Sequence, residues 1–290
     1  MNRPWLPLIW SISLLAWPIW IAGQELPLMV VGSHYVKDIL GYDSSEEQES
    51  IAYRMTSSLL GDMKIREGLA DVAFVIQSSE AHPSTPGTAN ILLGFWGVFF
   101  AVHRDNPLTE VPLNRLSELL RNTRHGLNSK WGFLLPGEPD WTNRPLLVTF
   151  GLTEEDPSYP VLNHWFFQDE KVAEFGSLGE NPADPFGAGS SALLVLPQLP
   201  EVDQGLRLLS LVQPGDSVGF LPSQENLFFG DYPLRCSLHL IARDISEPRT
   251  RRFLAEFFQS GDLEKLGNSG FVVVPANVRN QALLEFDLEF

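Results

Sequence analysis

The sequence predicts an α/β fold, and three observations support the prediction. From residue 26 onward, short apolar runs alternate with short amphipathic ones, which is typical of strands separated by helices. The stretch DVAFVI at 71–76 contains a continuous apolar run, as a strand buried on both faces does. The hydrophobic fraction of 44% and the spread of aromatic residues suffice for a packed core and argue against disorder.

The first third of the chain contains clear strand and helix patterns. We expect strands at 28–31, 51–55 and 71–76, and a helix at 59–69, where four apolar residues recur at roughly helical spacing. The stretch 91–107 is too rich in glycine and β-forming residues to be one helix. We therefore expect one or two strands there, which cross between two lobes and end in a turn.

The remaining elements follow the same alternation. A helix is expected from Pro112 through the leucines at 113–120, because proline suits the first helical position. The other predicted elements are strands at 144–150, 217–221 and 236–242, and helices at 160–167, at 187–195 from a Gly/Ser-rich start, and at 251–266.

The charge of the chain excludes two classes of partner. The formal net charge is −16, and basic residues form no cluster of five or more, so neither nucleic acid nor an anionic membrane surface is expected to bind. Cys236 is the only cysteine, which rules out an intramolecular disulfide. Its place in the apolar alternation LRCSLHLIA predicts a small buried hydrophobe rather than a reactive thiol.

The N-terminus has the pattern of a targeting segment. Arg3 is followed by an apolar stretch from Trp5 to Ala22, and Ala22-Gly23 places small residues before a polar pair. We therefore expect residues 1–23 to be a cleaved signal peptide. The alternative is a retained membrane anchor, which the prolines inside the stretch disfavour.

Four separated segments follow one another in a recognisable order. They are GLADVAFV at 68–75, GVFFAVHRDNPLTEVPLNRLSELL at 97–120, DSVGFL at 216–221, and the closing stretch YPLRCSLHLIARDISEPRTRRFLAEFFQSGDLEKLGNSGFVVVP. In this order they resemble the phosphate-type periplasmic substrate-binding proteins of ABC transporters. The resemblance covers most of residues 26–275.

This resemblance implies a two-lobed periplasmic-binding-protein fold of type II, with a central cleft and hinge crossover strands. The first lobe would comprise residues 24–98 plus 231–290, and the second residues 99–230. It also implies a periplasmic or secreted protein that binds a small oxyanion such as phosphate. Its partners would be the membrane subunits of an ABC transporter, or a sensor. We expect a monomer with no cofactor and no metal.

The resemblance places the candidate ligand-binding residues at two turns of the first lobe. In the family, phosphate is bound by backbone N–H groups at helix starts and by Ser/Thr hydroxyls. Gly32-Ser33 stands at the family's first Gly-Ser turn, and Thr56-Ser57-Ser58 stands at a Gly-Ser-Gly turn that opens a helix. Both glycines of that second turn are missing here. Ser33, Ser57 and Ser58 could alternatively be helix N-caps and nothing more.

The second lobe departs further from the family. Ser158 is the only plausible remnant of its "R…SGT" element, Leu152 stands at the arginine position, and Glu154, Glu155 and Asp156 crowd the loop. These carboxylates would repel a dianion, unless they are only a solvated loop or instead form a cation site. The family's acidic residue would fall near Gln77-Ser78, where there is no carboxylate.

Two hypotheses remain open from the sequence. The first is an exported solute-binding protein that closes over a small oxyanion or related polar solute. The second is an envelope interaction protein with an inactive or repurposed cleft, which the acidic loop favours. An enzyme is not expected, because the histidines are scattered and no nucleophile, metal-ligand or phosphate-loop motif occurs.

Overall fold

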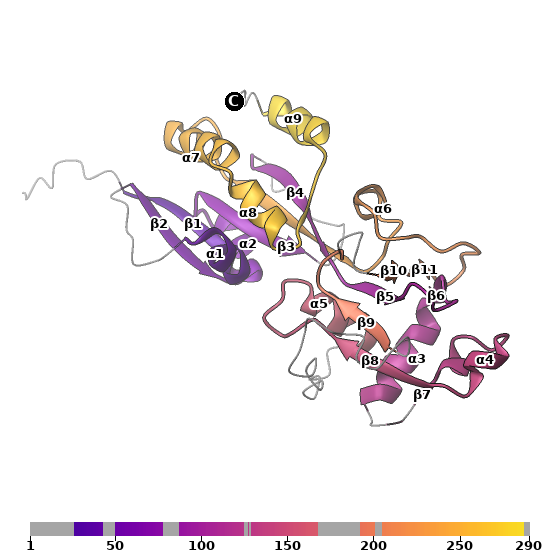
Figure 1. Ribbon diagram of the computed structural model, residues 1–290. Coiled ribbons are helices and arrows are strands. Elements are labelled where there is room, and N and C mark those ends of the chain that lie inside the picture. Colours follow the sequence, from indigo (N-terminus) through magenta and orange to yellow (C-terminus); the bar gives the residue numbers. More distant parts are fainter. Residues whose placement is uncertain are drawn as a thin grey trace, which may run out of the picture.

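The computed structural model describes residues 26–42, 50–77, 87–124, 127, 129–167, 192–200 and 205–286. The predicted signal peptide and most of the predicted helix start at 187–195 lie outside these residues. Within them the chain forms two α/β lobes, each built around one sheet (Figure 1). The predicted α/β class is therefore confirmed.

The larger sheet has six strands in the order β13-β4-β12-β3-β1-β2. The strands β1, β2 and β3 are parallel, and β12 pairs antiparallel with both β3 and β4. The bounds are β1 Leu28–Ser33, β2 Ile51–Thr56, β3 Val72–Gln77, β4 Ala89–Gly97, β12 Arg235–Ala242 and β13 Val272–Val273. The three strands predicted in this first part of the chain are thus confirmed.

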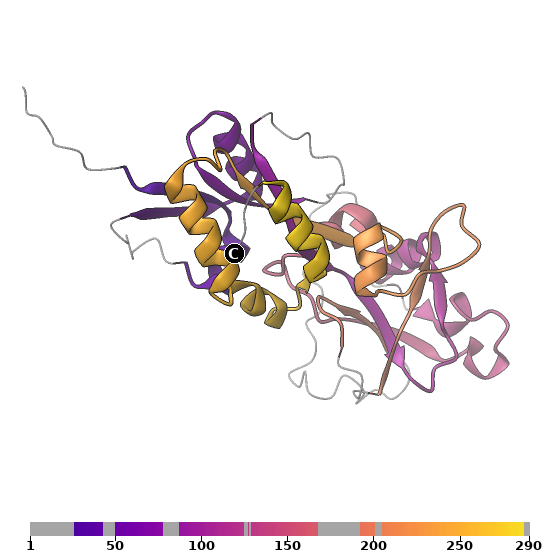
Figure 2. The same cartoon turned by 90° about the horizontal axis from the view of Figure 1, so that it is seen from above.

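Helices cover both faces of the larger sheet. On one face lie α1 (His34–Leu40), α7 (Pro248–Gln259) and α8 (Asp262–Asn268), and α2 (Ser58–Arg66) lies on the opposite face. Seen from above, α7 and α9 (Ala276–Glu285) lie over the strands (Figure 2). Neighbouring residues of β1 enter different clusters, Val30 the main core and Val31 the smaller core under α2. Burial on both faces explains why β1 and β3 are continuous apolar runs.

The smaller sheet has five strands in the order β10-β5-β9-β8-β7. Helix α3 (Leu113–Arg124) and the helical turn α5 (Tyr159–Leu162), which continues as a π-helical turn at Asn163–Phe167, pack against the main core. The strands are β5 Phe99–His103, β7 Ser129–Lys130, β8 Pro145–Phe150, β9 Ala192–Leu196 and β10 Leu206–Leu208. The other elements of this lobe are β6 Glu110–Pro112, β11 Ser210–Val212, a 3-10 turn at Trp131–Phe133, α4 Pro139–Thr142 and α6 Gln224–Phe229.

Two adjacent segments connect the lobes. The predicted crossing at 91–107 consists of two strands, β4 and β5, with Val98 between them. The N–H of Val98 donates to the carbonyl of Leu234 at 3.0 Å, and the hydroxyl of Tyr232 donates to the carbonyl of Val98 at 2.8 Å. Tyr232 and Val98 are both fully buried, and these hydrogen bonds hold the two crossing segments side by side between the two sheets.

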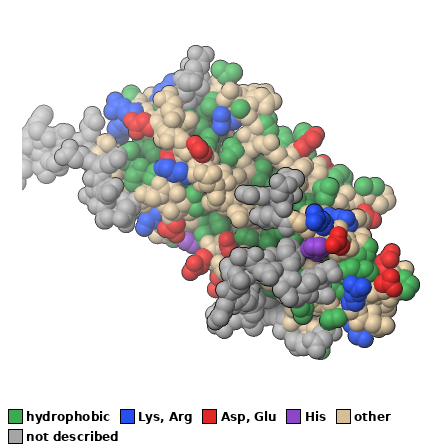
Figure 3. Space-filling view, in the orientation of Figure 1, with side chains coloured by type: hydrophobic (Ala, Val, Ile, Leu, Met, Phe, Trp, Pro, Cys, Tyr) green, Lys and Arg blue, Asp and Glu red, His purple; other side chains and the backbone are tan. Residues whose placement is uncertain are grey.

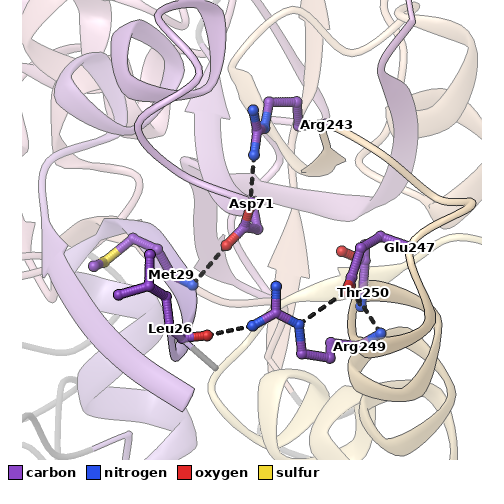
Figure 4. A network of polar contacts seen from close by, with 7 residues as sticks. All are labelled: Leu26, Met29, Asp71, Arg243, Glu247, Arg249 and Thr250. Atoms are coloured by element: carbon purple, nitrogen blue, oxygen red, sulfur yellow. Dashed lines mark hydrogen bonds and ion pairs between the residues drawn. The ribbon is translucent and has the colours of Figure 1, made fainter. Parts of the chain in front are cut away.

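A polar network fixes the start of β1 to the rest of its lobe (Figure 4). The Asp71 carboxylate accepts from the N–H of Met29 at 2.9 Å and from the guanidinium of Arg243 at 2.9 Å. Arg249 donates to the carbonyl of Leu26 and is paired with Glu247, which also caps α7. The network joins the residues just before β1 to the start of α7.

Several local predictions are wrong. Residues 217–221 form no strand, and only Phe220 makes a bridge, to Leu211. In the predicted helix at 187–195, the described residues from Ala192 onward belong to strand β9 instead. The predicted helix at 251–266 is two helices, α7 and α8, that break at Ser260-Gly261, and Pro112 ends β6 rather than opening α3.

The buried face of α2 also differs from the face that its apolar periodicity predicts. Leu59, Leu60, Met63 and Leu69 have 71%, 46%, 44% and 63% of their surface exposed. The helix packs on the sheet through Gly61 and Ile65 instead. The apolar spacing predicted the helix correctly but predicted the wrong buried face.

Candidate functional site

The candidate site lies at the carboxyl edge of the parallel strands β1, β2 and β3. These strands end at Ser33, Thr56 and Gln77, and Ser33 pairs directly with Thr56. Carboxyl ends of parallel strands meet at one edge of a sheet, where open α/β folds bind their ligands. The structure thus brings together five of the six predicted ligand-binding residues, which are Gly32, Ser33, Thr56, Ser57 and Ser58.

Glycines at two positions let the backbone approach closely at this edge. Gly32 has a φ of +133°, and a Cβ atom there would lie 2.1 Å from the carbonyl oxygen of Phe74. A Cβ atom at Gly61 would lie 2.8 Å from the Cα of Gly32. Helix α2 therefore lies against β1 through a glycine–glycine contact, and side chains are excluded at both positions.

The hydroxyls at the second turn already have partners in the protein. Ser57 is the N-cap of α2, and its oxygen accepts from the N–H of Leu60 at 3.2 Å. The oxygen of Ser58 accepts from the N–H of Ile76 at 2.9 Å, which joins α2 to β3. Both hydroxyls can still donate a hydrogen bond, but each oxygen already accepts one from a backbone N–H of the protein. For Ser57 the interpretation as a helix cap is therefore sufficient.

Ser33 differs from these two residues. It stands at the N-cap of α1 with a side chain that is nearly fully buried, yet it makes no capping hydrogen bond. The next residue, His34, is exposed and places Nδ1 3.3 Å from the carbonyl oxygen of Thr56. Ser33 thus stands at the N-cap position of α1 without capping it, whereas Ser57 caps α2.

Ser158 comes from the other lobe, at the end of the loop 151–158, hereafter the acidic loop. The tyrosine hydroxyl of Tyr35 in α1 donates to the carbonyl of Glu154 at 3.0 Å. The thiol of Cys236 in β12 lies 3.6 Å from the carbonyl oxygen of Pro157. These two contacts cross between the lobes, so the acidic loop lies beside the start of α1 and the start of β12.

The hydroxyl of Ser158 is buried without a partner. The residue has no exposed surface, and its oxygen atom has no hydrogen bond within the described part of the chain. Most buried polar groups in native proteins are hydrogen-bonded, so an exception at an inter-lobe position indicates a ligand contact or a bound water.

The sequence did not predict Gln77 as a site residue. It indicated only that the family's acidic residue is missing near this position. Its amide nitrogen, at the carboxyl end of β3, is buried and has no partner among the described residues. Asn163, which follows Ser158 by five residues, has a buried amide oxygen that also has no partner among the described residues. The signal that could have identified Gln77 was its position at the end of the third parallel strand.

The acidic loop gives this region a negative potential. The pKa of Tyr35 is raised, first by its burial and then by Asp156, by the thiolate that Cys236 forms at high pH, and by Glu154 and Glu155. Burial raises the pKa of the Cys236 thiol to about 12, so the thiol is neutral at physiological pH and does not contribute a charge. On the face drawn in Figure 3, Lys and Arg side chains are scattered and form no stripe.

The described residues contain no group of three or more His, Cys, Asp and Glu side chains that could bind a metal ion. In the same part of the chain, no helix has the length and apolar character needed to cross a bilayer.

Taken together, the two sheets, the paired crossing segments and the inter-lobe edge define a two-lobed periplasmic-binding-protein fold of type II. No family model matches the sequence, and no curated protein matches it. Solved structures do share the fold. A possible phosphate binding protein from Planctomyces limnophilus DSM 3776 superposes with a TM-score of 0.67 at 13% identity, over 90% of this chain and 98% of that one.

Two further structures have the same architecture. An ABC-type phosphate transport receptor from Vibrio cholerae has a TM-score of 0.58 at 14% identity, over 86% of this chain and 100% of its own. PstS from Borrelia burgdorferi has a TM-score of 0.58 at 15% identity, over 87% and 100%. These likenesses confirm the phosphate-type binding-protein fold, and at such identities they do not transfer a ligand.

Proposed function

We propose that this protein is a solute-binding protein whose two lobes, residues 24–98 plus 231–290 and residues 99–230, close over a small polar solute. The solute would lie between the carboxyl edge of β1–β3 and Ser158. The observation that carries the proposal is the fully buried and unpartnered hydroxyl of Ser158, at a point where the second lobe contacts the first. Ser33 would supply the corresponding hydroxyl from the first lobe.

The fold supports a transport or sensing role rather than an enzymatic one. The similar solved structures include an ABC-type phosphate transport receptor. A solute contacted by both lobes favours the closed arrangement, because only that arrangement makes both sets of contacts. Membrane subunits of an ABC transporter, or a sensor, would bind the closed form in the periplasm or outside the cell.

A direct test uses thermal unfolding of the purified protein with and without added solutes. Phosphate, sulfate and small amines are titrated, and native mass spectrometry of the freshly purified protein detects any solute that copurifies. A solute at 100 times its dissociation constant adds about 2.7 kcal/mol to the free energy of unfolding, a shift of several degrees for a protein of this size.

Two serine variants separate ligand contact from capping. Ser158→Ala should leave the stability of the free protein unchanged, because it removes a polar group without a partner, and should weaken solute binding by at least tenfold. Ser57→Ala should cost about 1 kcal/mol of stability, through loss of the α2 cap, and leave the affinity nearly unchanged. Equal affinities of Ser158→Ala and the wild type would refute the proposed contact.

The second candidate is an envelope interaction protein with an inactive inter-lobe site. The exposed apolar face of α2 favours this candidate, because contiguous apolar surface often marks a protein contact. So do the Tyr35–Glu154 and Cys236–Pro157 contacts, which join the lobes through the protein's own groups. This candidate predicts that no small solute shifts the unfolding midpoint.

A further inference from the structure

We propose that the inter-lobe site takes a small solute with a cationic ammonium or guanidinium group and rejects phosphate and other dianions. The inference rests on the proposed function, because it names the solute class of the same site. It departs from the similar solved structures, which include an ABC-type phosphate transport receptor.

The first argument is the position of the acidic loop. The hydrogen bond from Tyr35 to the carbonyl of Glu154 places the loop directly beside the start of α1, where the carboxyl edge begins. The charges of Glu154, Glu155 and Asp156 all act on the Tyr35 hydroxyl, so all three carboxylates lie close enough to influence a ligand there. A dianion at the same place would meet three like charges.

The second argument is that these carboxylates are not neutralised. Within the described residues, none of the three is in an ion pair with a Lys or Arg side chain. Asp156 accepts only from the N–H and the hydroxyl of Thr153. By contrast, Asp71 and Asp262, in the larger-sheet lobe, are paired with Arg243 and Lys265. No Lys or Arg side chain in the described part of the chain therefore offsets the charge of the acidic loop.

The third argument is independent of charge. Directly after the loop, the hydroxyl of Ser158 is fully buried and without a partner, and the amide oxygen of Asn163 is buried and unpartnered one turn later. Both atoms can accept hydrogen bonds, and a carboxylate can only accept. An ammonium or guanidinium group offers only donors, so it complements these second-lobe acceptors, whereas a fully ionised oxyanion could pair, among the unpartnered groups of the site, only with the Ser158 O–H and the buried amide nitrogen of Gln77.

The test compares cationic and anionic probes by isothermal titration calorimetry. Arginine, putrescine, phosphate and sulfate are titrated into the wild type and into Glu154→Gln/Glu155→Gln/Asp156→Asn, in which the three charges are removed and the Asp156 turn keeps an acceptor oxygen. The matched control is Glu118→Gln/Glu138→Gln/Asp140→Asn, which makes the same charge change at exposed positions on α3 and around α4, away from the acidic loop (Figure 1).

We expect the wild type and the control to bind a cationic probe and not phosphate. The loop variant should lose affinity for that probe by about tenfold or more, and added salt should reduce this difference. The inference is overturned, with the proposed function intact, if the wild type binds phosphate. It is also overturned if a cationic probe binds the loop variant and the wild type equally. Failure of every probe to bind the folded wild type would count against both proposals.

Discussion

Replacing Gly32 by alanine tests the close approach of β1, β3 and α2 from which the candidate site is built. The new Cβ would lie 2.1 Å from the Phe74 carbonyl oxygen, on a backbone with φ +133°. The unfavourable backbone conformation costs about 1–3 kcal/mol. The clash is with the neighbouring strand rather than with a flexible side chain, so its relief adds about 1–3 kcal/mol. The total is about 2–6 kcal/mol.

The chain provides a matched control at Gly41, the C-cap of α1. Its φ is +75°, but a Cβ atom there would meet nothing within 4 Å. Gly41→Ala therefore tests the backbone conformation without the clash, and should cost about 1 kcal/mol. For a protein of this size, each kcal/mol lowers the unfolding midpoint by about 2–4 °C.

Differential scanning calorimetry of the two variants gives the comparison directly. We expect Gly32→Ala to lower the midpoint by roughly 4–24 °C and Gly41→Ala by roughly 2–4 °C. Equal shifts for the two variants would refute the reasoning, because they would show that β1, β3 and α2 do not approach each other closely at Gly32.

Two further predictions concern the larger-sheet lobe. Asp71→Ala should cost about 1.5–3 kcal/mol, measured by urea unfolding, because the N–H of Met29 loses a charged acceptor, while the exposed pair with Arg243 adds little. A loss below about 0.5 kcal/mol would contradict the role of the network. The pKa of Tyr53 is raised to about 12 by burial, Asp262 and Glu256. Its stabilising contribution is therefore complete below pH 10 and is lost as the pH rises from 10 toward 12, since only the unfolded state releases the proton there. Tyr53→Phe should flatten the fall in stability over this pH range, and an unchanged slope would contradict the assignment.

The sequence predicted the positions of the parallel strands better than it predicted which face of a helix is buried. The strands β1 and β3 are continuous apolar runs because both of their faces are buried, and that signal is local, whereas the edge strand β2 contains polar and exposed residues. The apolar spacing of α2 was equally local, but Gly61 allows the helix to approach β1 so closely that Ile65, rather than the leucines, enters the core. Which face is buried thus depended on a contact with another element.

Short apolar runs also led to two wrong predictions of secondary structure. The run that begins at Ala192 suits a helix or a strand equally well, and pairing with β5 and β8 decided for a strand. At 217–221 the alternation suggested a strand, but only Phe220 finds a partner, in Leu211, while Val218 and Leu221 remain exposed.

The candidate site could be located from the sequence, but its hydrogen bonds could not. The resemblance placed Ser33 and Ser57 at two turns, and the structure brings those turns to one edge. That Ser57 caps its helix while Ser33 does not is a matter of side-chain geometry at each N-cap. Ser158 is buried beside a contact between distant parts of the chain, because the carbonyl oxygen of the preceding Pro157 lies 3.6 Å from the thiol of Cys236, 79 residues away.

The attachment of Leu26 to α7 by Arg249 has a practical consequence for measuring solute binding. Leu26 precedes β1, whereas Ser33 ends it, so the two residues lie at opposite edges of the larger sheet, roughly 20 Å apart at the rise of an extended strand. A sensor-chip linkage or a fluorescent label attached ahead of Leu26 would therefore leave the inter-lobe edge unobstructed. A label on the acidic loop would instead sit where the lobes meet, and its emission would report their closure.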